Sequence, residues 1–250
     1  PKAVPFRTPG MERSGMPRRR RSRFRRTLAA VGVLALGGSL AACAPSPSVE
    51  VPEGDGPVVA FYGDSYTLGT GASDPSVRWS SVISEQRGWR EVNPSVNGLG
   101  FVNNRSAYGE DSGDLPDLVI AADPDIVFVT MGLNDNFSYA TASDRIHDQI
   151  TADLTRLHDA LPDARFIVVE PFWYTEERPE SLTVISDWVE AAAADIGADY
   201  IPGASRWLDG HYAGSTDSWM ASDGLHPDDT GYAHMAEEMD AALADLTPPL

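Results

Sequence analysis

Apolar residues form short continuous runs along much of the chain. Two such runs, at residues 58–62 and 126–130, are bounded by Gly, Pro and Asp, and a third covers residues 166–169. Continuous apolar runs of this length are typical of strands that are covered on both faces. The pattern therefore predicts at least three buried strands.

Between and after these runs, apolar residues recur at intervals of three and four. This spacing is typical of amphipathic helices, and it occurs in three places: at Ile146, Ile150, Leu154, Leu157 and Leu161, at Leu182, Ile185, Val189 and Ile196, and at Tyr232, Met235, Met239, Leu243 and Leu246. Alternating strands and helices predict parallel pairing with right-handed crossovers. We therefore expect an α/β fold, a three-layer α/β/α sandwich with a central parallel sheet of the flavodoxin-like kind.

The amino-terminal part has the layout of an export signal. Seven arginines within residues 18–26 precede an uncharged stretch, residues 27–42, that is rich in Ala, Leu, Val and Gly. The stretch ends in Leu-Ala-Ala-Cys43, which resembles a bacterial lipobox, so Cys43 is the expected lipidation site. An uncleaved membrane helix needs about 20 strongly apolar residues, and this shorter run contains three glycines. The pattern favours a lipoprotein signal peptide.

The sequence thus predicts three parts: a leader and signal peptide at residues 1–42, a lipidated cysteine and flexible tether at 43–57, and one folded domain at 58–250. The tether is expected to be flexible because Pro, Ser and Gly dominate it. The predicted location is the extracytoplasmic face of the cell membrane, with a lipid on Cys43 as the anchor. An Arg25-Arg26 pair leaves the general and twin-arginine export routes open. We expect a monomer.

Charge changes sign at the predicted cleavage point. The whole chain has a net charge of −18, but residues 43–250 contain 9 basic and 36 acidic residues, a net charge of −27. Such a domain repels polyanions, so we do not expect it to bind nucleic acid.

Candidate chemistry follows two of the predicted strands. The first runs into Gly-Asp-Ser65 and the second into Gly-Leu-Asn134. Ligands bind beyond the carboxyl ends of parallel strands, so a serine hydroxyl and an amide donor are expected at one edge of the sheet. Each motif alone is also ordinary turn composition.

A third motif, Asp223-Gly-Leu-His226, lies just before the last predicted helix. An aspartate three residues before a histidine in a tight loop can orient the imidazole and stabilise its cation. The other ring nitrogen then remains free to take a proton from a serine.

Taken together, the three motifs in this order resemble the SGNH (GDSL) hydrolase superfamily, over residues 58–246. The resemblance implies carboxylic ester hydrolysis without metal or cofactor. It implies that Ser65 is the nucleophile, that His226 is general base and then general acid, and that Asp223 orients His226. It also implies an oxyanion hole made by the N–H groups of Ser65 and Gly98 and by the Asn134 side chain. Gly100 remains the alternative to Gly98.

Substrate and reaction type stay partly open. We expect short acyl or O-acetyl esters, of envelope carbohydrate or of lipid, as small-molecule or glycan substrates. The alternatives are an acyltransferase that uses the same serine and a catalytically silent surface-binding lipoprotein. Trp173 and Trp207 are candidate substrate contacts. The remaining histidines lack metal-ligand spacing, so no metal is expected; they are His147, His158, His211 and His234.

Overall fold

The computed structural model describes residues 48–107 and 114–250. Its centre is a sheet of five parallel strands in the order β2-β1-β3-β4-β5. The strands are β1 Val58–Gly63, β2 Arg90–Val92, β3 Ile126–Thr130, β4 Arg165–Val169 and β5 Asp199–Ile201.

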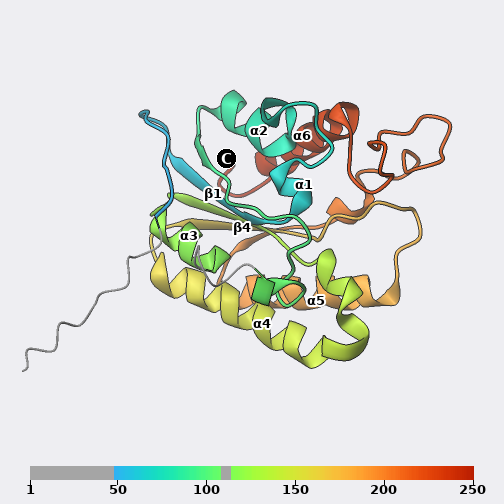
Figure 1. Ribbon diagram of the computed structural model, residues 1–250. Helices are drawn as coiled ribbons and strands as arrows, with labels where there is room; N and C mark the ends of the chain where they lie inside the picture. Colours follow the sequence, from blue (N-terminus) through green and yellow to red (C-terminus); the bar gives the residue numbers. More distant parts are fainter. Residues whose placement is uncertain (1–47, 108–113) are drawn as a thin grey trace, which may run out of the picture. The chain divides into compact units, whose positions relative to one another are not determined.

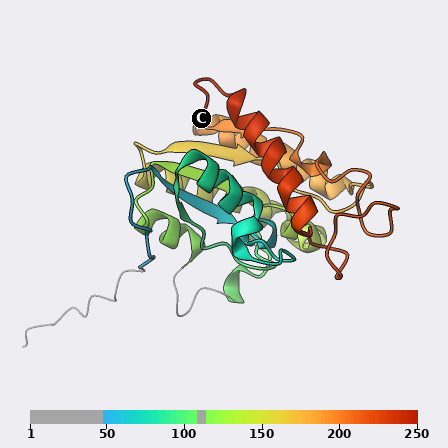
Figure 2. The same cartoon turned by 90° about the horizontal axis from the view of Figure 1, so that it is seen from above.

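Helices cover both faces of the sheet (Figures 1 and 2). One face carries α1 Ser65–Leu68, α2 Trp79–Arg87 and α6 Asp229–Ala244. The other carries α3 Leu115–Ala121, α4 Tyr139–Ala160 and α5 Glu180–Asp195. Four short 3₁₀ turns complete the described elements: η1 Pro75–Val77, η2 Arg105–Ala107, η3 Asn134–Phe137 and η4 Ala204–Arg206. The predicted three-layer α/β/α sandwich is therefore confirmed.

The sheet separates two apolar cores, as the side chains of β1 show. Successive side chains of a strand point to opposite faces. Val59 and Phe61 accordingly pack in the core that contains Trp79 of α2, whereas Ala60 and Tyr62 pack in the core that contains Ile150 of α4. Every residue of β1 and β3 is buried, which explains why both read as uninterrupted apolar runs in the sequence.

The strand order places a topological switch point between β1 and β3. The chain passes from β1 to β2 on one side, then crosses to β3 on the other side of β1. Helices that leave on opposite faces open a crevice at the carboxyl ends of two such strands, and ligands bind there. Ser65 follows β1 and Asn134 follows β3.

The amino-terminal predictions fall mostly outside the described residues. The predicted signal peptide at 1–42, the predicted lipidation site Cys43 and the start of the predicted tether lie there. Of the predicted tether, Val49 and Val51 are half-buried against the core next to α4, and Arg90 Nε donates a 2.7 Å hydrogen bond to the Gly56 carbonyl. In the described ranges no helix is both long enough and apolar enough to cross a membrane.

Candidate active site

Ser65 is the first residue of α1, directly after β1. The turn is tight: a Cβ at Gly63 would lie 2.6 Å from both Thr67 Cβ and Thr130 Oγ1, so only glycine fits there. Asp64 caps α1, because its Oδ1 accepts the Tyr66 N–H at 3.0 Å. The Ser65 hydroxyl makes no hydrogen bond to any other described residue.

Asp223 and His226 form a hydrogen-bonded pair. Asp223 Oδ2 lies 2.7 Å from His226 Nδ1, and Asp223 Oδ1 accepts the N–H groups of Leu225 at 2.9 Å and His226 at 3.0 Å. Partial burial raises the pKa of Asp223, but the hydrogen bonds from His226 and Leu225 outweigh it and lower that pKa to about 2. An ionised Asp223 holds the proton on Nδ1, which leaves Nε2 as an acceptor.

The loop that carries this pair is fixed by hydrogen bonds. Ala221 N–H donates to the His226 carbonyl at 2.8 Å, and Met220 and Pro227 form an isolated antiparallel bridge. The Tyr66 hydroxyl donates to the Leu225 carbonyl at 2.6 Å, and the centroid of the Tyr66 ring lies 5.9 Å from that of the His226 imidazole. Tyr66 therefore joins the serine turn to the histidine loop.

A cavity of about 120 Å³ brings the candidate residues together. Its lining comprises Ser65, Tyr66, Asn97, Gly98, Leu133, Asn134, Leu225 and His226. Four of the five residues chosen from the sequence thus share one cavity, and the fifth, Asp223, is bonded to His226. Tyr66, Leu133 and Leu225 are cavity residues that sequence reasoning missed.

Gly98 and Gly100 differ in what their N–H groups do. Gly98 has φ +71°, lines the cavity, and its N–H has no partner among residues 48–107 and 114–250. The Gly100 N–H instead donates to the Asn103 carbonyl at 2.9 Å. Of the two, only Gly98 offers a free donor at the cavity.

Asn134 links three segments. Its Nδ2 donates to Asp64 Oδ2 at 3.1 Å and to the Leu99 carbonyl at 3.0 Å, so both amide hydrogens already have acceptors. Burial raises the pKa of Asp64 to about 7, opposed by the Tyr66 and Asn134 hydrogen bonds and reinforced by the nearby Asp135 charge. An oxyanion in the cavity would be a third acceptor for the Asn134 amide.

Asp135, the residue after Asn134, also escaped the sequence reasoning. It is completely buried and accepts three backbone N–H groups, from Phe101 at 2.7 Å, Val102 at 2.8 Å and Asn103 at 3.1 Å. The one signal in the sequence was a charged residue five positions after the end of a buried strand.

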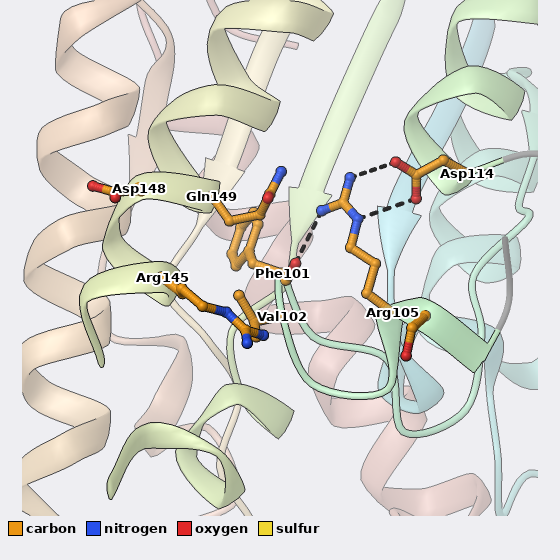
Figure 3. A pocket seen from close by; sticks show the side chains of 8 residues that line it. Phe101, Val102, Arg105, Asp114, Arg145, Asp148 and Gln149 are labelled. Carbon is orange, nitrogen blue, oxygen red and sulfur yellow. Dashed lines mark hydrogen bonds and ion pairs between the residues drawn. The ribbon is translucent and has the colours of Figure 1, made fainter. Parts of the chain in front are cut away.

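A larger cavity, about 480 Å³, lies beside the loop that follows Gly98 (Figure 3). Phe101, Val102 and Gln149 line it, and the Arg105 guanidinium lies between Asp114 and the Phe101 carbonyl. It contains none of Ser65, Asp223 and His226. Ser65 and His226 both line the smaller cavity, which makes it the candidate active site.

The two expected aromatic contacts lie elsewhere. Neither Trp173 nor Trp207 lines the small cavity. Trp173 is buried, with Nε1 donating to Thr175 Oγ1 and the Glu177 carbonyl, and Trp207 packs against Phe172. Across the described ranges, no three His, Cys, Asp or Glu side chains are grouped as a metal site.

Comparison with known proteins identifies the family. The sequence profile of the GDSL-like Lipase/Acylhydrolase family matches residues 61–234. A GDSL lipase of Mycobacterium tuberculosis is 28% identical over 191 residues, which cover 72% of this chain and 79% of the relative.

Two solved structures share the fold. The crystal structure of TesA has a TM-score of 0.60 and 20% identity over 77% of this chain and 99% of TesA. The psychrotrophic esterase EstA from Pseudoalteromonas sp. has a TM-score of 0.57 and 17% identity, over 75% and 96% of the two chains. The chain therefore belongs to the GDSL-like lipase/acylhydrolase family and is a hydrolase of the SGNH type.

Proposed function

We propose that the chain is a serine esterase in which Ser65 is the nucleophile, His226 the general base and Asp223 the residue that orients His226. One observation carries the proposal: the Asp223–His226 hydrogen bond of 2.7 Å holds an imidazole at the cavity that Ser65 lines. This arrangement matches the roles in a serine, histidine and aspartate triad.

The reaction follows from these positions. His226 Nε2 takes the proton of the Ser65 hydroxyl while the serine oxygen bonds to the ester carbonyl carbon. Collapse of the tetrahedral intermediate breaks the bond to the alcohol, which leaves with the proton from His226. Water then attacks the acyl-serine in the same way, and the acid and free Ser65 result.

The oxyanion has two free donors, the N–H groups of Ser65 and Gly98, which have no partner in the described part of the chain. The Asn134 amide completes the hole by sharing a hydrogen now directed at Asp64 or the Leu99 carbonyl. Each such donor contributes about 3 kcal/mol of transition-state stabilisation.

The substrate class is a short acyl ester, including O-acetyl esters of carbohydrate or lipid. Support comes from the cavity, whose volume of about 120 Å³ is small and whose walls include Tyr66, Leu133 and Leu225. Long acyl chains would extend beyond these walls.

Hydrolysis of p-nitrophenyl esters of increasing acyl length tests this function. We expect the highest kcat/KM with acetate or butyrate and its loss in Ser65→Ala. Equal activity in Ser65→Ala would refute the proposed nucleophile. Slow hydrolysis that becomes fast acyl release when a sugar alcohol is added would favour the acyltransferase, and no labelling of Ser65 by any activated ester would favour a silent binder.

A lipid anchor on Cys43 and export to the extracytoplasmic face of the cell membrane are part of the same proposal. Their support is the arginine-rich and apolar leader that ends in Leu-Ala-Ala-Cys43. Incorporation of labelled palmitate by the wild-type chain, and its absence in Cys43→Ala, is the expected result. Label retained in that variant would refute the anchor.

A further inference from the structure

The loop of residues 98–103 carries the Gly98 N–H but belongs to no helix or strand. Its position is fixed from the β3 side, because the Asp135 carboxylate accepts the N–H groups of three consecutive residues, Phe101 to Asn103, at 2.7 to 3.1 Å. Three converging donors on one buried carboxylate define both the place and the orientation of the loop.

The loop backbone at Gly100 packs tightly against the Asp135 carboxylate. A Cβ at Gly100 would lie 2.5 to 2.6 Å from the Asp135 carboxylate atoms, so the backbone lies directly against the carboxyl group. Asp135 itself is completely buried and does not line the catalytic cavity.

Asn103 connects Asp135 to Gly98 through hydrogen bonds. Its N–H donates to Asp135, and its Nδ2 donates to the Gly98 carbonyl at 2.9 Å. The Asn103 Oδ1 is fixed in turn by the Ser138 hydroxyl at 2.6 Å. A continuous set of hydrogen bonds therefore runs from Asp135 to the carbonyl of Gly98.

The same loop also meets Asn134, whose Nδ2 donates to the Leu99 carbonyl at 3.0 Å. Asn134 and Asp135 are consecutive in the chain, and both contact the loop from the end of β3. The places of two oxyanion donors, the Gly98 N–H and the Asn134 amide, are thus tied to one short segment.

From this geometry we infer that Asp135 is a positioning residue of the oxyanion hole: it holds loop 98–103 against η3 so that the Gly98 N–H points into the cavity. The inference rests on the proposed esterase function. Asp135 touches no reacting atom and acts through the loop.

Asp135→Asn tests this role, because it replaces one of the two accepting carboxylate oxygens by an NH2 group, which cannot accept an N–H. We expect kcat for p-nitrophenyl acetate to fall about 10- to 100-fold, less than for outright loss of a donor, with KM within about twofold of wild type. Asp125→Asn is the matched control. Asp125 accepts the Val58 N–H at 2.7 Å at the amino-terminal end of β1, away from the cavity, and the kcat of this variant should be unchanged.

Asn103→Ala provides a second variant in case Asp135→Asn does not fold. It removes one of the two amides that donate to the Gly98 carbonyl, the other being Asn104 Nδ2 at 3.0 Å, and leaves Asp135 and the cavity lining intact. We expect kcat to fall about tenfold with KM unchanged, and the double variant with Asn134→Ala to lose less than the product of the two single losses.

Active sites are counted in each variant by phosphonate titration, so that loss of folded protein is separated from loss of turnover. A wild-type kcat per active site in Asn103→Ala and Asp135→Asn, with only lowered thermal stability, would overturn the inference while leaving the esterase proposal intact. Undiminished turnover in Ser65→Ala would overturn the esterase proposal instead.

Discussion

The two halves of the active site are built in different ways. Ser65 and Asn134 follow buried strands and are 4% and 7% exposed, so packing around β1 and β3 fixes them. Asp223 and His226 lie on a surface loop that hydrogen bonds fix, and their side chains are 46% and 13% exposed. Substitutions on the strand side should therefore disturb both stability and turnover, whereas those in the histidine loop should disturb turnover alone.

The largest expected effect is on the loop side. His226→Ala removes the proposed general base and should lower kcat about 10⁴-fold or more, while the unfolding free energy changes by less than about 1 kcal/mol. Steady-state kinetics and urea unfolding measure the two quantities. His158→Ala, on the partly exposed surface of α4, is the control and should change neither.

On the strand side, Asp64 should make stability depend on pH. Its pKa in the folded state is raised by burial to about 7, above the 3.8 of the unfolded chain. Its contribution to stability is therefore fully present below about pH 4 and is lost as the pH rises through 7. The stability of wild type relative to Asp64→Asn should fall by on the order of 4 kcal/mol from pH 4 to pH 8.

Urea unfolding at several pH values measures this difference. Asp74→Asn is the control with the opposite sign, because hydrogen bonds from Ser76 lower the pKa of Asp74. A wild-type and Asp64→Asn pair whose stability difference is the same at every pH would show that Asp64 does not titrate in this range.

Asn134→Ala should combine both kinds of effect. Loss of the proposed oxyanion donor should lower kcat about 10²- to 10³-fold, or about 3 kcal/mol. Loss of the bonds to Asp64 and the Leu99 carbonyl lowers the unfolding free energy by about 1 to 3 kcal/mol. Kinetics and unfolding on the same preparation separate the two effects. A variant with normal stability would show that the Asn134 hydrogen bonds to Asp64 and the Leu99 carbonyl do not stabilise the fold.

Tyr66→Phe should give the smallest effect, because Tyr66 bridges the two halves through one hydroxyl. Loss of its hydrogen bond to the Leu225 carbonyl costs about 1 kcal/mol of stability. The ring still packs against Phe172, so turnover should fall only a few-fold as the histidine loop loosens. A change in stability without any change in kcat would mean that the loop does not need this bridge.

The sequence predicted the strands and helices that have long, regular patterns of apolar residues. β1, β3 and β4, and the helices α4, α5 and α6, carry long apolar patterns and were predicted. β2 and β5 were not, since each has three residues and includes charged, half-exposed side chains at Arg90 and Asp199. α1, at four residues, is too short to show a helical period.

The candidate site divides in a similar way. Ser65, Asn134, Asp223 and His226 were chosen because each occupies a recognisable position in a short motif. Nothing local distinguishes Gly98 from Gly100, and the difference depends on the Asn103 carbonyl that occupies the Gly100 N–H. The hold of Asp135 on Phe101 spans 34 positions in the sequence, so no local pattern reveals it.

The most direct test of the central claim is covalent labelling. The purified chain is incubated with a p-nitrophenyl alkylphosphonate, which mimics the tetrahedral intermediate, and the labelled peptide is identified by mass spectrometry. We expect one adduct, on Ser65, that forms in step with loss of esterase activity and that His226→Ala slows by orders of magnitude. Complete loss of activity with the adduct on another residue, or with Ser65 unmodified, would contradict the account.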